Sequence, residues 1–170
     1  MSEILKFKRR AEALGLCAEY RGKWDVCSDK EGLVRTALDA NGVEFFADAI
    51  AFGWGVPIDY ISGEFGDYAH GQYCRRGDGY TSRMYVDVRS AIRIDTTLTL
   101  LIRCCCPVII PEGHACKVYV CGGSDLTIEN RGYMQLYVYG DDNKVTISDI
   151  DGAKSLLNNI HESSWAHGHK

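Results

Sequence analysis

The chain has 170 residues, of which 46% are hydrophobic and 25% are charged, and its formal net charge is −4. This length fits one domain or two small ones, and the composition excludes a disordered, collagen-like or long coiled-coil protein. The small negative charge also excludes a general binder of polyanions. The unusual numbers are 18 glycines and eight cysteines, against three prolines.

The first 17 residues lack the apolar stretch of a secretory signal, and the sequence contains no apolar run long enough to span a membrane. We therefore expect a cytoplasmic protein that makes no contact with a membrane. In a reducing cytoplasm the cysteines are expected to stay free thiols.

Residues 1–75 predict a small helical domain, because apolar residues recur at helical spacing from residue 4 to residue 14 and again after residue 28. The segment Ser28–Glu31 has the pattern of a capping box, which begins a helix, and Asn41-Gly42 is expected to end that helix. A strongly apolar helix is expected next, over residues 43–52.

Two helices around an Asn-Gly turn suggest a helix-turn-helix motif. A recognition helix presents Arg, Lys, Asn or Gln to the bases. The second helix, over residues 43–52, offers only Glu44 and Asp48 as polar side chains, and phosphates would repel both. The sequence therefore argues against a nucleic-acid partner.

Residues 76–150 contain a repeat. Residues 117–122 match residues 135–140 at an offset of 18, and residues 125–128 match residues 144–147 at an offset of 19. Each unit reads as two short strands with alternating apolar residues and a turn after each strand. Four apolar columns follow, which are Met84, Leu100, Val118 and Leu136; Val86, Ile102, Val120 and Val138; Ile92, Val108, Leu126 and Val145; and Ile94, Ile110, Ile128 and Ile147.

A single unit cannot bury its own inner face, but stacked units can. We therefore predict an α+β protein in which a helical unit, residues 1–75, caps a short right-handed β-solenoid of about four rungs, residues 76–150. The four columns are expected to fill its interior. Residues 151–170 are expected to form a C-terminal helix or tail, with Leu156, Leu157 and Ile160 as its apolar contacts. The alternative is an antiparallel β-sandwich, which gives no reason for a direct repeat.

Tyrosines form the predicted partner-binding surface. Outward residues of stacked rungs form ladders, and tyrosine contributes contact area and a hydrogen bond at low entropic cost. The candidates are Tyr73, Tyr80, Tyr85, Tyr119, Tyr137 and Tyr139.

A zinc site is a weaker candidate, and no other cofactor is expected. Thiols and an imidazole gather in one stretch, but the Cys-x-x-Cys spacing is absent, and consecutive strand residues point to opposite faces. We expect buried thiols rather than a bound metal. The candidate ligands are Cys104, Cys106, His114, Cys116 and Cys121.

The enzyme alternative is a β-solenoid that acts on carbohydrates through paired carboxylates. The available acidic residues are Asp87, Asp95, Glu112, Asp125 and Glu129. Most of them fall at predicted turns, where Asp is common. The sequence does not place any two of them on one face.

Three segments, Ala37–Gly42, Phe52–Gly55 and Asp78–Ser82, resemble a family of small uncharacterised proteins from prophages and mobile elements of gut bacteria. The resemblance extends to about residue 150. It implies a genomic setting and no particular chemistry. In that setting we expect a non-catalytic interaction protein that inhibits or modulates a host or defence protein. An open edge at the last rung would also allow a homodimer.

Overall fold

The computed structural model describes residues 9, 13, 22 and 29–165. The helix expected over residues 4–14 therefore lies largely outside the described residues. The described helices are α3 (Lys30–Ala37), α4 (Ala40–Ala51), α5 (Ile58–Phe65) and the 3-10 helix η1 (Gly66–Ala69). The strands are β1 (Arg75–Gly77), β2 (Tyr80–Val86), β3 (Ile92–Arg93), β4 (Leu98–Ile102), β5 (Cys105–Ile110), β6 (Ala115–Cys121), β7 (Asp125–Asn130), β8 (Tyr133–Tyr139), β9 (Lys144–Asp149) and β10 (Lys154–Ile160).

The strands form two sheets, one of six strands in the order β1-β2-β4-β6-β8-β10 and one of four in the order β3-β5-β7-β9. All neighbouring strands are parallel except β1 and β2. The chain passes from one sheet to the other and back, so each turn adds one strand to each sheet. This arrangement is a β-solenoid of about four turns, as the repeat predicted, and it excludes the antiparallel sandwich.

Helices α3 and α4 begin at acidic caps. The Asp29 carboxylate accepts a hydrogen bond from Gly32 N at 2.8 Å, and the Asp39 carboxylate accepts one from Asn41 N at 3.0 Å. Each satisfies a backbone donor that has no partner inside its helix. The prediction that Asn41-Gly42 ends a helix is therefore wrong, because Asp39 begins α4 there.

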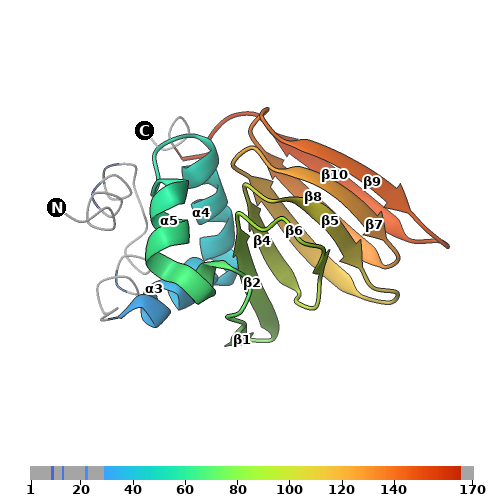
Figure 1. The fold of residues 1–170 in the computed structure, drawn as a ribbon, viewed down its shortest axis with the longest axis horizontal. Coiled ribbons are helices and arrows are strands. Elements are labelled where there is room, and N and C mark those ends of the chain that lie inside the picture. Colours follow the sequence, from blue (N-terminus) through green and yellow to red (C-terminus); the bar gives the residue numbers. More distant parts are fainter. Residues whose placement is uncertain (1–8, 10–12, 14–21, 23–28, 166–170) are drawn as a thin grey trace.

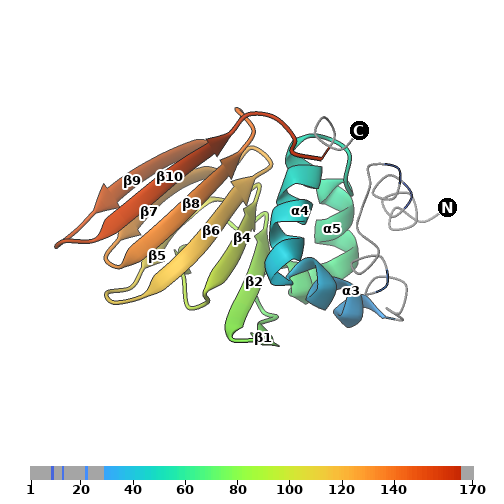
Figure 2. The ribbon, with the colours of Figure 1, turned by 180° about the vertical axis from the view of Figure 1, so that it is seen from behind.

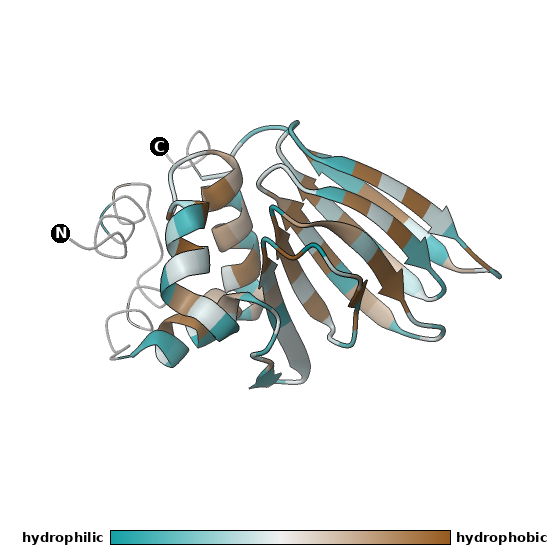
Figure 3. Ribbon diagram, viewed as in Figure 1, coloured by the Kyte–Doolittle hydropathy of each residue, from teal (hydrophilic) through white to brown (hydrophobic). Residues whose placement is uncertain are grey.

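The helices form a third layer on the outer face of the six-stranded sheet (Figures 1 and 2). One core lies between the helices and this sheet, and a second lies inside the solenoid between the two sheets. Strand β4 contributes to both, since all five of its residues are buried. Along most strands apolar and polar residues alternate instead, which is visible as stripes in Figure 3. The helical unit thus shares a core with the solenoid.

The register corrects the predicted columns. Met84 lies beside Leu100, as expected, but Leu100 lies beside Tyr119, so the repeat between β4 and β6 is 19 residues and not 18. A slip of one residue exchanges the two faces of a strand. Met84, Val86, Leu100 and Ile102 therefore pack against the helices instead of filling the solenoid.

The columns from the four-stranded sheet keep their face. Val108 lies beside Ile128, and Leu126 lies beside Cys106, so the shift from the predicted pairing is two residues. Residues two apart on a strand share a face, and Val108, Leu126 and Ile128 therefore remain in the solenoid core.

Each turn leaves the six-stranded sheet through a residue in the left-handed backbone region. These corner residues are Asp87, Arg103, Gly122 and Gly140, with φ of 57°, 50°, 77° and 89°. Glycine adopts this conformation without strain, whereas other residues pay an energetic cost for it. Because this left-handed conformation recurs directly after β2, β4, β6 and β8, the corners of successive turns stack.

The prediction of a C-terminal helix or tail is wrong for residues 154–160, which form β10. This strand pairs in parallel with all seven residues of β8. The exposed edge of β8 offers backbone partners to a following segment, and this outweighs the weak helical spacing of Leu156 and Ile160. The chain then returns to α4, where Ser164 N donates to the buried Asp48 carboxylate at 2.9 Å and Trp165 packs edge-on against Phe45.

Candidate interaction surface

The predicted tyrosine ladder exists, but it is internal. The Tyr119 ring stacks on Tyr137 with centroids 5.0 Å apart and an interplanar angle of 11°. Helix α4 covers it, so Tyr119 is 1% exposed and Tyr139 is 5% exposed, and the Tyr119 hydroxyl donates to Glu44 at 3.4 Å. Burial raises the pKa of both phenols. These tyrosines join the helices to the sheet and are not available to a partner, whereas Tyr137 is partly exposed.

The three other predicted tyrosines lie apart from this ladder. Tyr73 packs edge-on against Tyr68, and the Tyr85 ring packs onto the end of the solenoid core, close to Gly71. The Tyr80 hydroxyl accepts a hydrogen bond from Ala40 N at 2.9 Å. Of the six predicted tyrosines, only Tyr80 lines the groove described below.

Helix α4 does not present a base-reading face. Its side chains Val43, Phe45 and Phe46 are buried in the core that it shares with the sheet. Of its two acidic residues, Asp48 is buried and Glu44 accepts the hydrogen bond from Tyr119. The helix considered for a helix-turn-helix motif is thus a core helix.

The candidate zinc ligands do not converge. The Cys104 thiol donates to Tyr85 O at 3.3 Å, and His114 Nε2 is 2.8 Å from Thr96 O, in another part of the rung. Burial raises the pKa of Cys104 and of Cys116 to about 12, which keeps both as neutral thiols. Across residues 29–165, no three His, Cys, Asp or Glu side chains gather in a group that could hold a metal.

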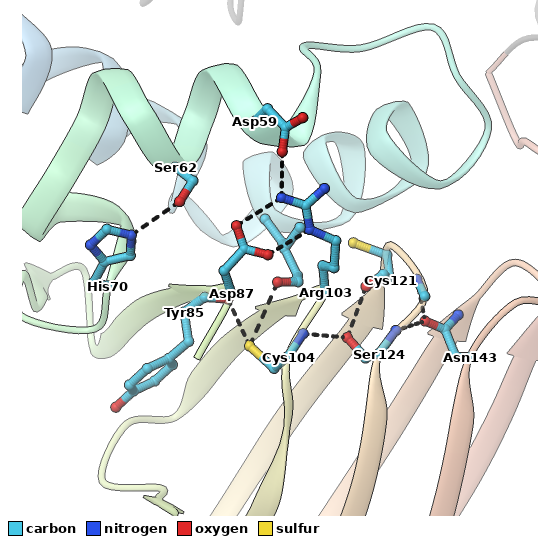
Figure 4. A network of polar contacts seen from close by, with 12 residues as sticks. Asp59, Ser62, His70, Tyr85, Asp87, Arg103, Cys104, Cys121, Ser124 and Asn143 are labelled. Atoms are coloured by element: carbon cyan, nitrogen blue, oxygen red, sulfur yellow. Dashed lines mark hydrogen bonds and ion pairs between the residues drawn. The ribbon is translucent and has the colours of Figure 1, made fainter. Parts of the chain in front are cut away.

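A polar network braces the corner where α5 meets the solenoid (Figure 4). Arg103 forms two hydrogen bonds with Asp87, at 2.5 and 2.8 Å, and a third with Asp59 at 2.6 Å. Its guanidinium lowers the pKa of Asp87 below the usual range of a carboxyl. Asp87 and Arg103 are the two corner residues that are not glycine, so this pairing stabilises a strained backbone and ties it to α5.

The same figure contains a serine–histidine pair, with Ser62 Oγ 3.2 Å from His70 Nε2. A nucleophile–base pair needs a third group that orients the imidazole. In the described part of the chain, His70 Nδ1 has no hydrogen-bond partner. The pair therefore lacks the arrangement that acyl transfer requires.

The carboxylates of the carbohydrate-enzyme alternative are dispersed. Asp87, Asp95 and Glu129 pair with arginines of their own neighbourhood, and Asp125 lies on the outer face of the four-stranded sheet. None of the five candidates lines the groove described next. The geometry gives that alternative no support.

A groove of about 730 Å³ lies on the six-stranded sheet, beside the helical layer. It crosses the first residues of β2, β4, β6, β8 and β10. The register aligns two rows across these strands, one of Ala115, Tyr133 and Lys154 and one of Leu98, Lys117, Gln135 and Leu156.

The groove combines apolar surface with unpaired positive charge. Tyr133 is 55% exposed and Leu156 is 63% exposed, both high for large apolar side chains. Lys117 and Lys154 form no ion pair with any described residue. Asp149, at the rim, is held by hydrogen bonds from Asn130 and Ser155. The groove can therefore accept an apolar group flanked by anions.

The last turn of the solenoid is open. Strands β9 and β10 end their sheets, and no described segment pairs with their outer edges. The inward side chains Val145 and Ile147 are only partly buried, and Leu157 is 49% exposed. The first turn, in contrast, is covered by β1 on one sheet and by Tyr85 at its end.

Reasoning from the sequence did not predict the groove, and it did not predict that β10 forms the open edge of the last turn. Lys117 and Gln135 occupy outward positions in the repeat, so their exposure could have been predicted. Lys154 and Leu156 could not, because residues 151–170 were expected to form a helix or tail. The position of the groove also depends on how far α4 extends over the sheet.

Comparison with known families, curated proteins and solved structures finds no match to this chain. Among the described helices, the longest has 12 residues, and none is long and apolar enough to cross a membrane.

Proposed function

We propose that this protein is a non-catalytic protein-interaction module whose binding element is the open last turn of the solenoid. The observation that carries the proposal is the outer edge of β10, with which no segment of the described residues pairs, together with the exposed Leu157. Unpaired strand edges bind other strands, and natural proteins usually protect them with charge, proline or a covering segment. From Lys154 to Ile160 the only charged residue is the first.

The simplest partner is a second copy of the chain. Antiparallel pairing of two β10 strands around a two-fold axis centred on Leu157 would bring the two Leu157 side chains together and continue both solenoid cores. The partly buried Val145 and Ile147 would be covered in the same interface. A symmetric dimer of this kind would also remove the aggregation hazard of the edge.

Light scattering coupled to size exclusion tests the dimer. At about 100 µM, well above the dissociation constant of a specific dimer, the expected mass is twice the 18.9 kDa of one chain. Leu157→Lys should give the monomer, because it places a charge at the interface while leaving the half-exposed position tolerable in the monomer. Thr127→Lys is the matched control, on an exposed outward position of the inner strand β7. A monomeric wild-type protein at this concentration would refute the dimer.

The resemblance to prophage and mobile-element proteins extends the proposal to a host or defence protein as a second partner, one that this protein inhibits or modulates. Free thiols at all six described cysteines are compatible with action in the cytoplasm. Affinity capture from bacterial lysate should enrich a partner with the wild-type bait and lose it with Leu157→Lys. If the two baits capture the same proteins, the open end is not the binding element.

A further inference from the structure

The groove on the six-stranded sheet has the chemistry of a second binding site, distinct from the open edge. Its floor includes Leu98 and Leu156, with the exposed ring of Tyr133 beside them. Contact with these three side chains favours an apolar group of the occupant, because the burial of apolar surface is favourable. Buried apolar contact with an aromatic anchor is typical of peptide recognition.

The two lysines define the charge of the occupant. Neither Lys117 nor Lys154 forms an ion pair within residues 29–165, and the one carboxylate that lines the groove, Asp149, accepts hydrogen bonds from Asn130 and Ser155 instead. Rim ammonium groups beside an apolar floor attract a carboxylate ligand, steer its approach and select against neutral ones. The register places Lys117 on β6 and Lys154 on β10, two residues closer to the strand start.

This register sets a spacing. Two strand separations of about 4.8 Å and two residues of about 3.3 Å give about 12 Å between the lysine Cα positions. In an extended peptide, residues four positions apart are about 13 Å apart and point to the same side. The residue midway between them points the same way, and it would meet Tyr133 and Gln135 on the intervening strand β8.

We propose that the groove binds an extended segment of a partner protein with the pattern acidic–x–apolar–x–acidic. The two carboxylates pair with Lys117 and Lys154, and the apolar side chain between them packs over Tyr133 and Gln135, with Leu156 beside Gln135 on the next strand. This inference rests on the proposed interaction function and names the chemistry of a partner. It uses the outward face of the sheet, whereas dimerisation uses the edge and the inward Leu157.

Peptide-display selection tests the inference, with a library of random 12-residue peptides and the full chain as target. Wild-type protein should enrich peptides with two acidic residues four positions apart and an apolar residue between them. The double variant Lys117→Ala, Lys154→Ala should bind the enriched peptides at least tenfold more weakly, and raising the salt concentration should weaken wild-type binding. The control Lys144→Ala removes an exposed lysine of β9 and should bind like wild type.

Thermal melts of the double variant establish that it is folded, which is expected because Lys117 and Lys154 are exposed. Leu157→Lys should keep peptide binding while losing the dimer, so failure of the groove and failure of the edge give different results. Three outcomes would overturn the inference: no enrichment, enriched peptides without paired acids, or equal binding to the double variant. Retention of polygalacturonate through the same lysines, without peptide enrichment, would assign the groove to an acidic polysaccharide and would also overturn it.

Discussion

Leu100 and Leu101 are adjacent, fully buried residues of β4 that belong to different cores. Leu100 packs against the helices, and Leu101 packs inside the solenoid. Truncating a buried leucine to alanine costs about 3 kcal/mol, through lost burial and the cavity that remains. Each variant should therefore lose a large part of a total stability that is about 5–15 kcal/mol for a natural domain.

Hydrogen exchange separates the two variants. If the helical layer opens from an intact solenoid, Leu100→Ala lowers the free energy of that opening by the full amount, because only the closed state contains the contact. Amides of α4 should then exchange about 100-fold faster, since each 1.4 kcal/mol corresponds to a factor of ten. Leu101→Ala leaves this opening unchanged, because its cavity exists in both states.

The assay is exchange measured by NMR or mass spectrometry under native conditions, with Leu101→Ala as the matched control. Equal acceleration of α4 amides in both variants would refute the separation into two cores. A loss below about 1 kcal/mol in urea unfolding of either variant would refute the packing on which the magnitude depends.

Four further predictions concern stability and reactivity. Asp48→Ala leaves three hydrogen-bond donors, two of them in the C-terminal segment, without their acceptor. It should therefore lower the free energy of unfolding by about 2–4 kcal/mol. Unchanged urea unfolding would contradict a stabilising role for these three hydrogen bonds. Arg103→Ala should lower the free energy of unfolding by only about 1 kcal/mol at low salt, because the guanidinium is partly exposed. The loss should shrink in 0.5 M NaCl, because salt screens ion pairs. A loss that does not depend on salt would argue against ion pairing. Cys104 and Cys116 have pKa values raised to about 12 by burial, whereas an unfolded thiol ionises near pH 8.5. The unfolded state therefore binds fewer protons than the folded state above that pH. The contribution of each buried thiol to the free energy of unfolding should be fully present below pH 8.5 and should fall by up to about 1.4 kcal/mol per pH unit between pH 9 and 12. Urea unfolding that does not change over this pH range would contradict the burial of these thiols. Iodoacetamide should modify the exposed Cys105 before these two buried thiols, as peptide mapping would establish, and simultaneous modification would contradict the fold.

The repeat was readable in the sequence because a solenoid places equivalent residues in stacked turns. Strands β6 to β9 matched the columns closely, since Lys117–Gly122 and Gln135–Gly140 carry the same pattern. The error arose between β4 and β6, where Leu98–Ile102 is buried at every position and apolar at every position except Thr99. A nearly continuous apolar run has no clear period, so the sequence could not specify which residue faces which core.

The candidate site was predicted less well, for a related reason. An outward tyrosine can face solvent or a covering layer, and the local pattern is the same in both cases. Helix α4 covers Tyr119 and leaves Tyr133 exposed, which depends on where that helix ends on the sheet. The strand β10 was missed because Leu156 and Leu157 do not alternate, and its conformation is imposed by the free edge of β8.

By itself the sequence determined the architecture: short helices first, then a stack of repeated strand pairs with glycine at several corners. These features are local or periodic, so neighbouring residues specify them. Only the tertiary structure decided which faces stay open. The closure of the tyrosine ladder, the groove beside Lys117 and the exposure of the β10 edge among the described residues all depend on how segments distant in the chain pack together, and such packing leaves no period in the sequence.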